Sequence, residues 1–260
     1  MRMRRKPNLE PRLEKCAHLL VAQPEALRGQ WLERFFRNGV PDSPPFGNSV
    51  PDSSPFGNSV PDSLPFVNAV ADSPPSGNDI PDKLPFRELH IELGCGKGLF
   101  AVETAKREPD ILFIALERVA NVIVIALERS KQEGLCNVRY INGLVDDLAM
   151  FFSEGEVSRI YINFCDPWPA RRHVRRRLTG QRFLEIYKQV LRPGGEIHFK
   201  TDDLPLFEFS LNEFEQSGFL RLNTTRDLHK NGPVGIMTDY EKKFYEKGAP
   251  IYSCVVRTAK

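Results

Sequence analysis

From residue 88 onward, apolar residues follow two patterns: compact runs, and positions three and four residues apart. Compact apolar runs predict strands buried on both faces, and apolar residues three and four positions apart predict helices that cover them. Strands separated by helices indicate an α/β fold with a doubly wound, mostly parallel sheet. The predicted strands are 89–93, 111–116, 138–141, 157–164, 196–201 and 251–257, and the predicted helices are a segment ending near 109, 120–133, 179–191 and 204–216.

The beginning of the chain has a helical pattern of its own. From Leu9 to Leu20, apolar residues recur at helical spacing, which predicts one or two helices within residues 8–36. Four basic side chains precede them at 2–6, without the apolar stretch of a secretory signal. No apolar run is longer than Val122–Leu127, which is far shorter than the ~20 residues of a membrane span. We therefore expect a protein that does not enter a membrane.

A repeat of ten residues separates these helices from the strand pattern. Its units begin at positions 40, 50, 60, 70 and 80, and ten of the 21 prolines lie between 41 and 81. Proline removes the amide donor, and one apolar residue per unit cannot fill a core, so we expect a disordered, Pro-rich insert. A polyproline II recognition arm is the alternative. The predicted organisation is a basic arm with helices at 1–38, the repeat at 39–85 and an α/β domain at 86–260.

Charge is distributed unevenly. The formal net charge is +2, but the repeat carries six Asp and one Lys, so the rest of the chain has an excess of about seven positive charges. Five arginines and one histidine lie at 171–177 and predict a polyanionic partner, most often nucleic acid; a solvated charged surface is the alternative. The five cysteines form no CxxC pair, which favours reduced thiols in a cytoplasm over disulfides or a zinc site, and we expect no metal.

The first candidate site is the glycine-rich loop after strand 89–93. Gly94, Gly96 and Gly98 permit a sharp turn close to a ligand, but their spacing fits neither the dinucleotide fingerprint nor a P-loop. Glu92 stands two residues before the first glycine, as in S-adenosylmethionine enzymes, where a carboxylate meets the methionine ammonium. Glu117 ends the next strand, where a carboxylate can accept ribose hydroxyls. Together they predict a methyl-donor site, against the alternative of a packing turn and a surface glutamate.

A second candidate lies at the end of strand 157–164. The sequence Asp166-Pro167-Trp168-Pro169 places an acid and an aromatic ring in a loop stiffened by two prolines, at the sheet edge where ligands bind. The arginine run follows directly, and arginines grip phosphates at RNA surfaces. Trp168 is a candidate for stacking on a base, with packing as an equally favoured role.

These motifs carry a resemblance. GCGKG at 94–98, NFCDPWPARRHVRRRL from residue 163, FKTDD at 199–203, MTDYEKKF at 237–244 and the opening MRMRRKP resemble the bacterial tRNA (guanine-N7-)-methyltransferase family. The resemblance covers residues 1–38 and 86–260. It implies a Rossmann-like class I methyltransferase fold, S-adenosylmethionine as donor, and tRNA as substrate, methylated at guanine N7 at position 46 of the variable loop. The choice between monomer and homodimer stays open.

The resemblance also implies roles for individual residues. Asp166 matches the catalytic aspartate, which also faces the cofactor, and Asp202 matches a substrate-binding aspartate. The implied cofactor-binding residues are Glu92, Gly94, Gly96, Gly98, Glu117, Asn142, Leu144 and Asp166. The implied RNA-binding residues are Ala170, Arg171, Arg172, His173, Arg175, Arg176, Arg177, Asp202, Thr238, Asp239, Tyr240 and Glu241.

The sequence departs from the family at two positions. Ala170 replaces a lysine that usually follows the DPWP motif, which puts one substrate contact in doubt although Arg171 is adjacent. Leu144 stands where an aspartate often contacts the adenine of the donor. The candidates to replace that aspartate are Asn142, Asp146, Asp147 and a backbone amide.

The chemistry needs little from the protein beyond alignment and charge. Guanine N7 has an in-plane lone pair and no proton, so methyl transfer to it needs no general base. A carboxylate such as Asp166 or Asp202 can accept from guanine N1–H and N2–H and offset the growing charge. We assign His173 to phosphate contact or packing, and Cys95 and Cys165 to packing. Two rival hypotheses remain: an amino-methyltransferase acting on an exocyclic nitrogen, and a non-catalytic RNA-binding protein on a methyltransferase scaffold.

Overall fold

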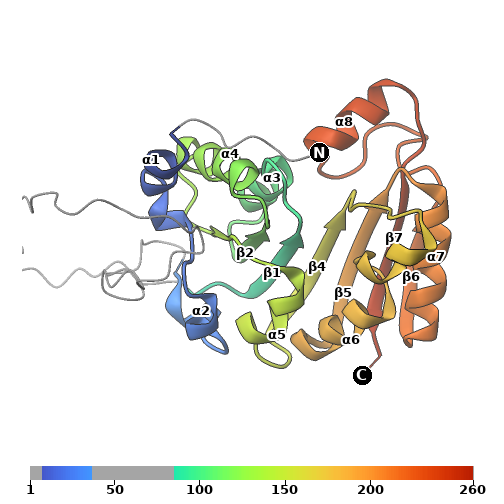
Figure 1. Cartoon of the computed structure of the whole chain (residues 1–260), viewed down its shortest axis with the longest axis horizontal. Coiled ribbons are helices and arrows are strands. Elements are labelled where there is room, and N and C mark those ends of the chain that lie inside the picture. The colour runs from blue at the N-terminus through green and yellow to red at the C-terminus, as the bar shows by residue number, and fades with distance from the viewer. Residues whose placement is uncertain (1–7, 37–84, 260) are drawn as a thin grey trace, which may run out of the picture.

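The computed structural model describes residues 8–36 and 85–259, in which a seven-stranded sheet forms the centre of the protein (Figure 1). The strand order is β3-β2-β1-β4-β5-β7-β6; β1 to β5 run parallel, and β7 lies antiparallel between β5 and β6. The predicted α/β fold with a mostly parallel sheet is confirmed. The strands are β1 (Glu88–Leu93), β2 (Ile111–Leu116), β3 (Val138–Ile141), β4 (Val157–Asn163), β5 (Leu191–Thr201), β6 (Phe219–Thr225) and β7 (Tyr252–Thr258).

Helices cover both faces of the sheet. In β2, Phe113 and Ala115 face a core built with α3 and α4, whereas Leu112 and Ile114 face the core that contains α6 and α7. Side chains alternate along a strand, so a strand between two helix layers must be apolar throughout, as β2 is. The helices are α1 (Leu9–Glu14), α2 (Trp31–Arg34), α3 (Leu99–Arg107), α4 (Ala120–Gln132), α5 (Leu148–Phe151), α6 (Gln181–Val190), α7 (Leu204–Gln216) and α8 (Asp239–Glu246), with 3-10 turns at Ala17–Leu19, Pro24–Leu27, Val145–Asp147 and Arg171–Arg176.

The N-terminal helices are shorter than the sequence predicts. α1 ends at Glu14, and the chain continues in short turns instead of a second long helix. Leu20 forms a parallel bridge with Tyr140 of β3, and the amide of Val21 donates to the Tyr140 carbonyl at 2.8 Å. This extended pairing with the outer strand breaks the helical path. Trp31 anchors the segment, because its ring is fully buried in the core.

Three elements near the C-terminus differ from prediction. β5 begins at Leu191 because this residue pairs with Val157 across a bulge that contains Pro193-Gly194-Gly195, which we expected to separate a helix from a strand at 196. β6 was not predicted; it is an edge strand whose leucines Leu220 and Leu222 are half exposed. α8 was not predicted either, although its first turn carries a sequence signal described below.

The repeat at 40–83 and the basic residues at 2–6 lie outside the described residues. Of the segment 39–85 that we expected to be disordered, only Pro85 is described. Phe36 and Pro85 pair in an antiparallel bridge, so the described chain stops and resumes at one place. In residues 8–36 and 85–259, no helix is long and apolar enough to span a membrane. The same residues contain no group of three or more His, Cys, Asp or Glu side chains arranged to hold a metal ion.

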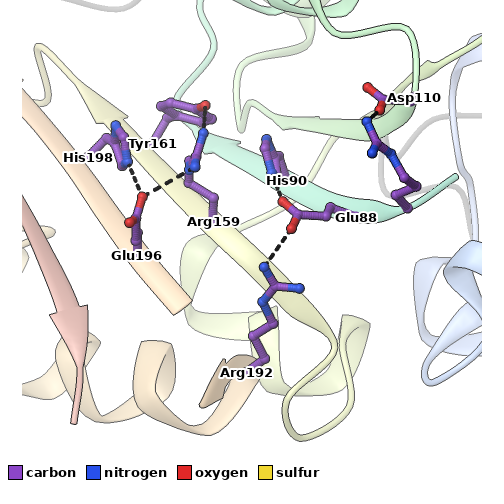
Figure 2. Close-up of polar contacts among 9 residues, drawn as sticks. Glu88, His90, Asp110, Arg159, Tyr161, Arg192, Glu196 and His198 are labelled. Carbon is purple, nitrogen blue, oxygen red and sulfur yellow. Dashed lines mark hydrogen bonds and ion pairs between the residues drawn. The ribbon is translucent and has the colours of Figure 1, made fainter. Parts of the chain in front are cut away.

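Polar side chains also lie on the sheet itself, on β1, β4 and β5 (Figure 2). Glu196 binds both His198, at 2.7 Å, and Arg159, at 3.3 Å. On β1, Glu88 binds His90 at 2.9 Å and Arg192 at 2.6 Å. Burial lowers the pKa of His90 to about 4, so this ring is neutral at physiological pH. The first group joins the neighbouring strands β4 and β5, and the second joins β1 to the start of β5 across β4.

Candidate functional site

A cavity of about 610 Å³ opens at the carboxyl ends of β1, β2 and β4. Its walls are the glycine loop, the end of β2, the segment after β3, and the DPWP loop with the arginine-rich turn that follows. The cavity lies at the topological switch point, where β1 is flanked by β2 and β4, as expected for a ligand site of this architecture. The predicted site residues that line it are Gly94, Glu117, Leu144, Asp166, Arg175 and Arg176.

The three glycines of the loop have two different uses. Gly94 and Gly96 have φ of +79° and +56°, and a Cβ at either would meet no atom within 4 Å. A Cβ at Gly98 would come within 2.5 Å of the Cβ of Ala126 and 3.2 Å of the Tyr140 hydroxyl. The first two therefore leave open space beside the backbone, and the third lets α3 approach α4.

Glu92 is buried behind this loop, with 1% of its surface exposed. Its Oε1 accepts a hydrogen bond from Asn163 Nδ2 at 2.9 Å. Its Oε2 and the Oδ1 of Asn163 are buried acceptors without a partner among the described residues. Burial raises the pKa of Glu92 to about 7, against the opposing effects of the Asn163 hydrogen bond and the Lys200 charge. Such a site lacks a donor, and above all a cationic one.

Glu117 lies on the cavity wall at the end of β2. Its Oε2 accepts from the Gly96 amide at 3.1 Å, and its Oε1 accepts from the Val119 amide at 2.9 Å. These bonds hold the carboxylate between the glycine loop and the start of α4. Each oxygen keeps a further lone pair, so the group can still accept from a pair of hydroxyls.

The segment after β3 forms the opposite wall. Leu144 is 50% exposed and lines the cavity together with Asp146, which pairs with Arg182. Asn142 does not line the cavity, because its Nδ2 donates to the backbone carbonyl of Glu117 at 2.8 Å. Asp147 does not line it either. Of these three polar candidates for the missing aspartate, only Asp146 reaches the cavity.

The DPWP loop holds Asp166 at the cavity in a constrained backbone. Phe164 and Trp168 have φ of +53° and +44°, a left-handed conformation that costs a non-glycine residue ~1–2 kcal/mol. Arg177 holds this geometry, because its Nε donates to the Pro167 carbonyl at 2.9 Å and its Nη2 to the Trp168 carbonyl at 3.2 Å. Asp166 itself is exposed at the cavity wall.

The arginine run forms the 3-10 turn Arg171–Arg176 beside the cavity. The guanidinium of Arg176 lies 4.8 Å from the centre of the Trp168 ring, and the His173 ring lies 5.6 Å from it. Trp168 is half buried beneath these basic side chains. The exposed members of the run and its flank are Ala170, Arg171, Arg172, Arg175 and Arg176.

The Thr238–Glu241 motif begins helix α8. Thr238 Oγ1 accepts from the Glu241 amide at 2.9 Å, and the Glu241 carboxylate accepts from the Thr238 amide at 3.2 Å, so the two residues form a capping box. Glu241 is fully buried and accepts from Lys200 Nζ at 2.7 Å. In this structure both side chains stabilise the helix and its attachment.

Tyr240 and Asp202 lie side by side, although 38 positions separate them in the sequence. The Tyr240 hydroxyl is 3.4 Å from Asp202 Oδ2, and its ring is 46% exposed. The ring centre lies 5.2 Å from that of Phe164, a residue of the cavity wall. Asp239 accepts from Arg129 Nη1 of α4 at 2.8 Å. Of the predicted substrate residues in this region, Tyr240 of α8 is thus brought to the border of the cavity, with Asp202, the residue after β5, beside it.

Cys95 and Cys165 are neutral thiols packed near the cavity. Burial raises the pKa of Cys165 to about 12 and also raises that of Cys95. Thiols in this state are poor nucleophiles, which agrees with a packing role.

Three residues escaped the sequence analysis. Asn163 and Lys200 are neighbours in the β4–β5 register, Asn163 as the last residue of β4 and Lys200 as the last but one of β5. Polar residues at the carboxyl end of an apolar strand were the available signal. His229 accepts from the Val234 amide at 3.1 Å and binds Glu241 at 2.9 Å. No pattern in the sequence around it predicts that position.

Several known proteins resemble this chain in sequence. A family model described as "Putative methyltransferase" matches residues 87–254. The chain is 38% identical over 255 residues to the tRNA (guanine-N(7)-)-methyltransferase of Geobacillus thermodenitrificans (strain NG80-2), an alignment covering 98% of this chain and 96% of that protein. It is 48% identical over 167 residues to the protein of that name from Geobacillus kaustophilus (strain HTA426), covering 64% of this chain and 77% of the relative.

A solved structure supports the fold alone. The 16S rRNA methyltransferase KamB superposes with a TM-score of 0.52 at 14% sequence identity, over 67% of this chain and 89% of that one. The resemblance recognised in the sequence motifs is confirmed by the relatives and by the family model together. The chain belongs to the tRNA (guanine-N(7)-)-methyltransferase family.

Proposed function

We propose that this protein transfers a methyl group from S-adenosylmethionine to N7 of a guanine in tRNA, at position 46 of the variable loop. The observation that carries the proposal is the cavity at the switch point, where two carboxylates and an open glycine loop lie beside an arginine-rich turn. Relatives of this family bear the corresponding name. Family membership does not favour the two rival hypotheses.

The residues around the cavity fit S-adenosylmethionine. The buried acceptors of Glu92 and Asn163 lack a donor, and an ammonium group would supply it. Glu117 offers two carboxylate oxygens to ribose hydroxyls, and Leu144 presents an exposed apolar surface to a purine. When bound, S-adenosylmethionine supplies a methyl group activated by a sulfonium. The residues proposed to hold it are Glu92, Gly94, Gly96, Glu117, Leu144, Asp146 and Asn163.

The protein acts on the acceptor by orientation and charge. N7 carries no proton, so the residues near it must hold its lone pair in line with the methyl group and offset the positive charge that grows on the base. Asp166 lies on the cavity wall in a loop fixed by Arg177, and Asp202 lies beside Tyr240, whose ring packs near Phe164 of the wall. Either carboxylate can accept from guanine N1–H and N2–H. The exposed arginines would bind tRNA phosphates.

The test is methylation of unmodified tRNA with donor labelled in its methyl group, followed by digestion to nucleosides. The labelled product expected is 7-methylguanosine. Label on an exocyclic nitrogen would instead support the amino-methyltransferase hypothesis. Tight tRNA binding without donor binding or label would support the non-catalytic RNA-binding hypothesis.

A further inference from the structure

A buried group of three polar side chains joins β5, α8 and the loop between β6 and α8. Glu241 accepts from Lys200 Nζ at 2.7 Å, and His229 Nε2 lies 2.9 Å from its other oxygen. Because the Val234 amide donates to His229 Nδ1, the proton of the neutral ring sits on Nε2 and points to Glu241. Glu241 is fully buried and His229 is 7% exposed, so the bonds form away from water.

These bonds anchor the first turn of α8 on one side, and Arg129 anchors it on the other. Arg129 of α4 donates to Asp239 at 2.8 Å, one residue before Tyr240, and Glu241 follows one residue after. Between the two anchors Tyr240 stays exposed, with its ring centre 4.6 Å from that of Phe244 and its hydroxyl beside Asp202. Figure 1 shows α8 at the end of the sheet to which the arrowhead of β4 points.

The anchored turn lies near the place proposed for the acceptor base and does not line the donor cavity. The described residues that line the donor cavity include none from α8 or from the loop that precedes it. Tyr240 contacts the site through Asp202 and Phe164, near the place proposed for the acceptor base. A shift of α8 should therefore disturb the RNA base and leave donor binding intact.

We propose that His229, acting through Glu241, is a positioning residue that holds α8 so that Tyr240 stands beside Asp202 and stacks on the guanine to be methylated. An exposed ring already packed on Phe244 suits a base that has left its stack. The inference rests on the proposed function. In it, Glu241 holds α8 in place and does not contact the RNA.

A matched pair of substitutions tests this role. In His229→Gln the amide nitrogen can take the place of Nε2 and donate to Glu241. In His229→Asn the shorter side chain can still accept from the Val234 amide but does not reach Glu241. Both variants are assayed below the lower of their melting temperatures, with kcat and KM for tRNA, the Kd for S-adenosylmethionine, and hydrogen exchange of residues 239–246.

We expect His229→Asn to lower kcat/KM for tRNA by about 10- to 100-fold, the scale of a base misplaced by ~1 Å, and to raise exchange in α8. Donor affinity should stay within about twofold, and His229→Gln should restore most of the rate. Equal rates in the two variants, or weaker donor binding in His229→Asn, would overturn the inference. If the wild-type protein forms no 7-methylguanosine, the proposed function fails instead, and the exchange of α8 still tests the anchor.

Discussion

Glu92→Gln separates what the buried carboxylate does for ligand binding from what it does to stability. Glu92 is enclosed, with one oxygen bonded to Asn163 and the other without a partner among the described residues. Glutamine has the same shape and carries no charge. Its amide nitrogen can donate to Asn163 Oδ1, which lacks a partner, while its oxygen keeps the existing bond.

The magnitude follows from the pKa of Glu92, which burial raises from 4.5 to about 7. A carboxyl with a raised pKa is favoured in its neutral form by the fold, so its contribution to stability is complete below pH 4.5 and is lost as the pH rises through 7. Relative to a side chain that never ionises, Glu92 then costs about 1 kcal/mol at pH 5 and about 3 kcal/mol at pH 8. Glu92→Gln should raise the free energy of unfolding by these amounts.

Urea unfolding of the ligand-free protein at pH 5 and pH 8 measures this gain in the free energy of unfolding. In a thermal scan at the higher pH, the same gain raises the melting temperature by about 6–12 °C. Exposed Glu185→Gln is the matched control and should change little at either pH. Glu92→Gln should also bind S-adenosylmethionine about 10- to 100-fold more weakly, because the ammonium group of the donor loses a charged acceptor worth ~1.5–3 kcal/mol. The protein would thus be more stable and less able to bind its ligand.

Two outcomes would refute this reasoning. A gain in stability that is equal at both pH values would show that Glu92 does not ionise at a cost in the folded protein. Unchanged donor affinity in Glu92→Gln would show that this carboxylate does not receive the ammonium.

Four further perturbations test other parts of the account. Gly98→Ala should lower the free energy of unfolding by about 2–4 kcal/mol in urea, because its Cβ would meet Ala126, whereas Gly134→Ala, with open space, should lose about 1 kcal/mol; equal losses would remove the packing role. The double variant Arg171→Ala and Arg172→Ala should raise KM for tRNA and flatten its salt dependence. Arg177→Ala should instead lower kcat, because it loosens the DPWP loop. Similar kinetics for the two variants at two salt concentrations would contradict this difference. Asp166→Asn should lower kcat by about 10²–10³ with the melting temperature unchanged, and near-normal turnover would leave Asp202 as the next candidate. Deletion of residues 40–79 should change the free energy of unfolding by less than about 2 kcal/mol, since the bridge between Phe36 and Pro85 already brings the flanks together; a large loss on calorimetry would show that the deleted segment packs on the body.

Much of the sheet was predictable because its strands are short and apolar. β2 and β3 match the predicted ranges 111–116 and 138–141, and helix α7 matches 204–216. Local pattern was enough here, since buried parallel strands and amphipathic helices leave strong periodic signals. The early start of β5 depends on pairing with Val157 across a bulge, which no local pattern contains. Likewise, Leu20 leaves its helical spacing to pair with β3.

Some features of the site were also predictable from local sequence, and others were not. Gly94, Glu117 and Asp166 were predicted from loops at strand ends, and the fold brings them to one cavity. Roles read from motifs alone were coarser: Gly98 packs helices, and Arg177 holds the DPWP loop. Capping chemistry at 238–241 carried a signal for α8 that periodicity did not. Contacts between distant segments, such as that of His229 with the helix, require the folded structure.

The most direct test of the central claim uses tRNA transcribed with 7-deazaguanosine, in which a carbon replaces N7 and every Watson–Crick hydrogen-bonding group is kept. We expect this tRNA to compete with unmodified tRNA for binding at a similar concentration and to receive no methyl group from S-adenosylmethionine. Unmodified tRNA treated in parallel should yield 7-methylguanosine. Methyl incorporation into the 7-deazaguanosine tRNA at the rate of the unmodified tRNA would place the reaction at another atom and contradict the account.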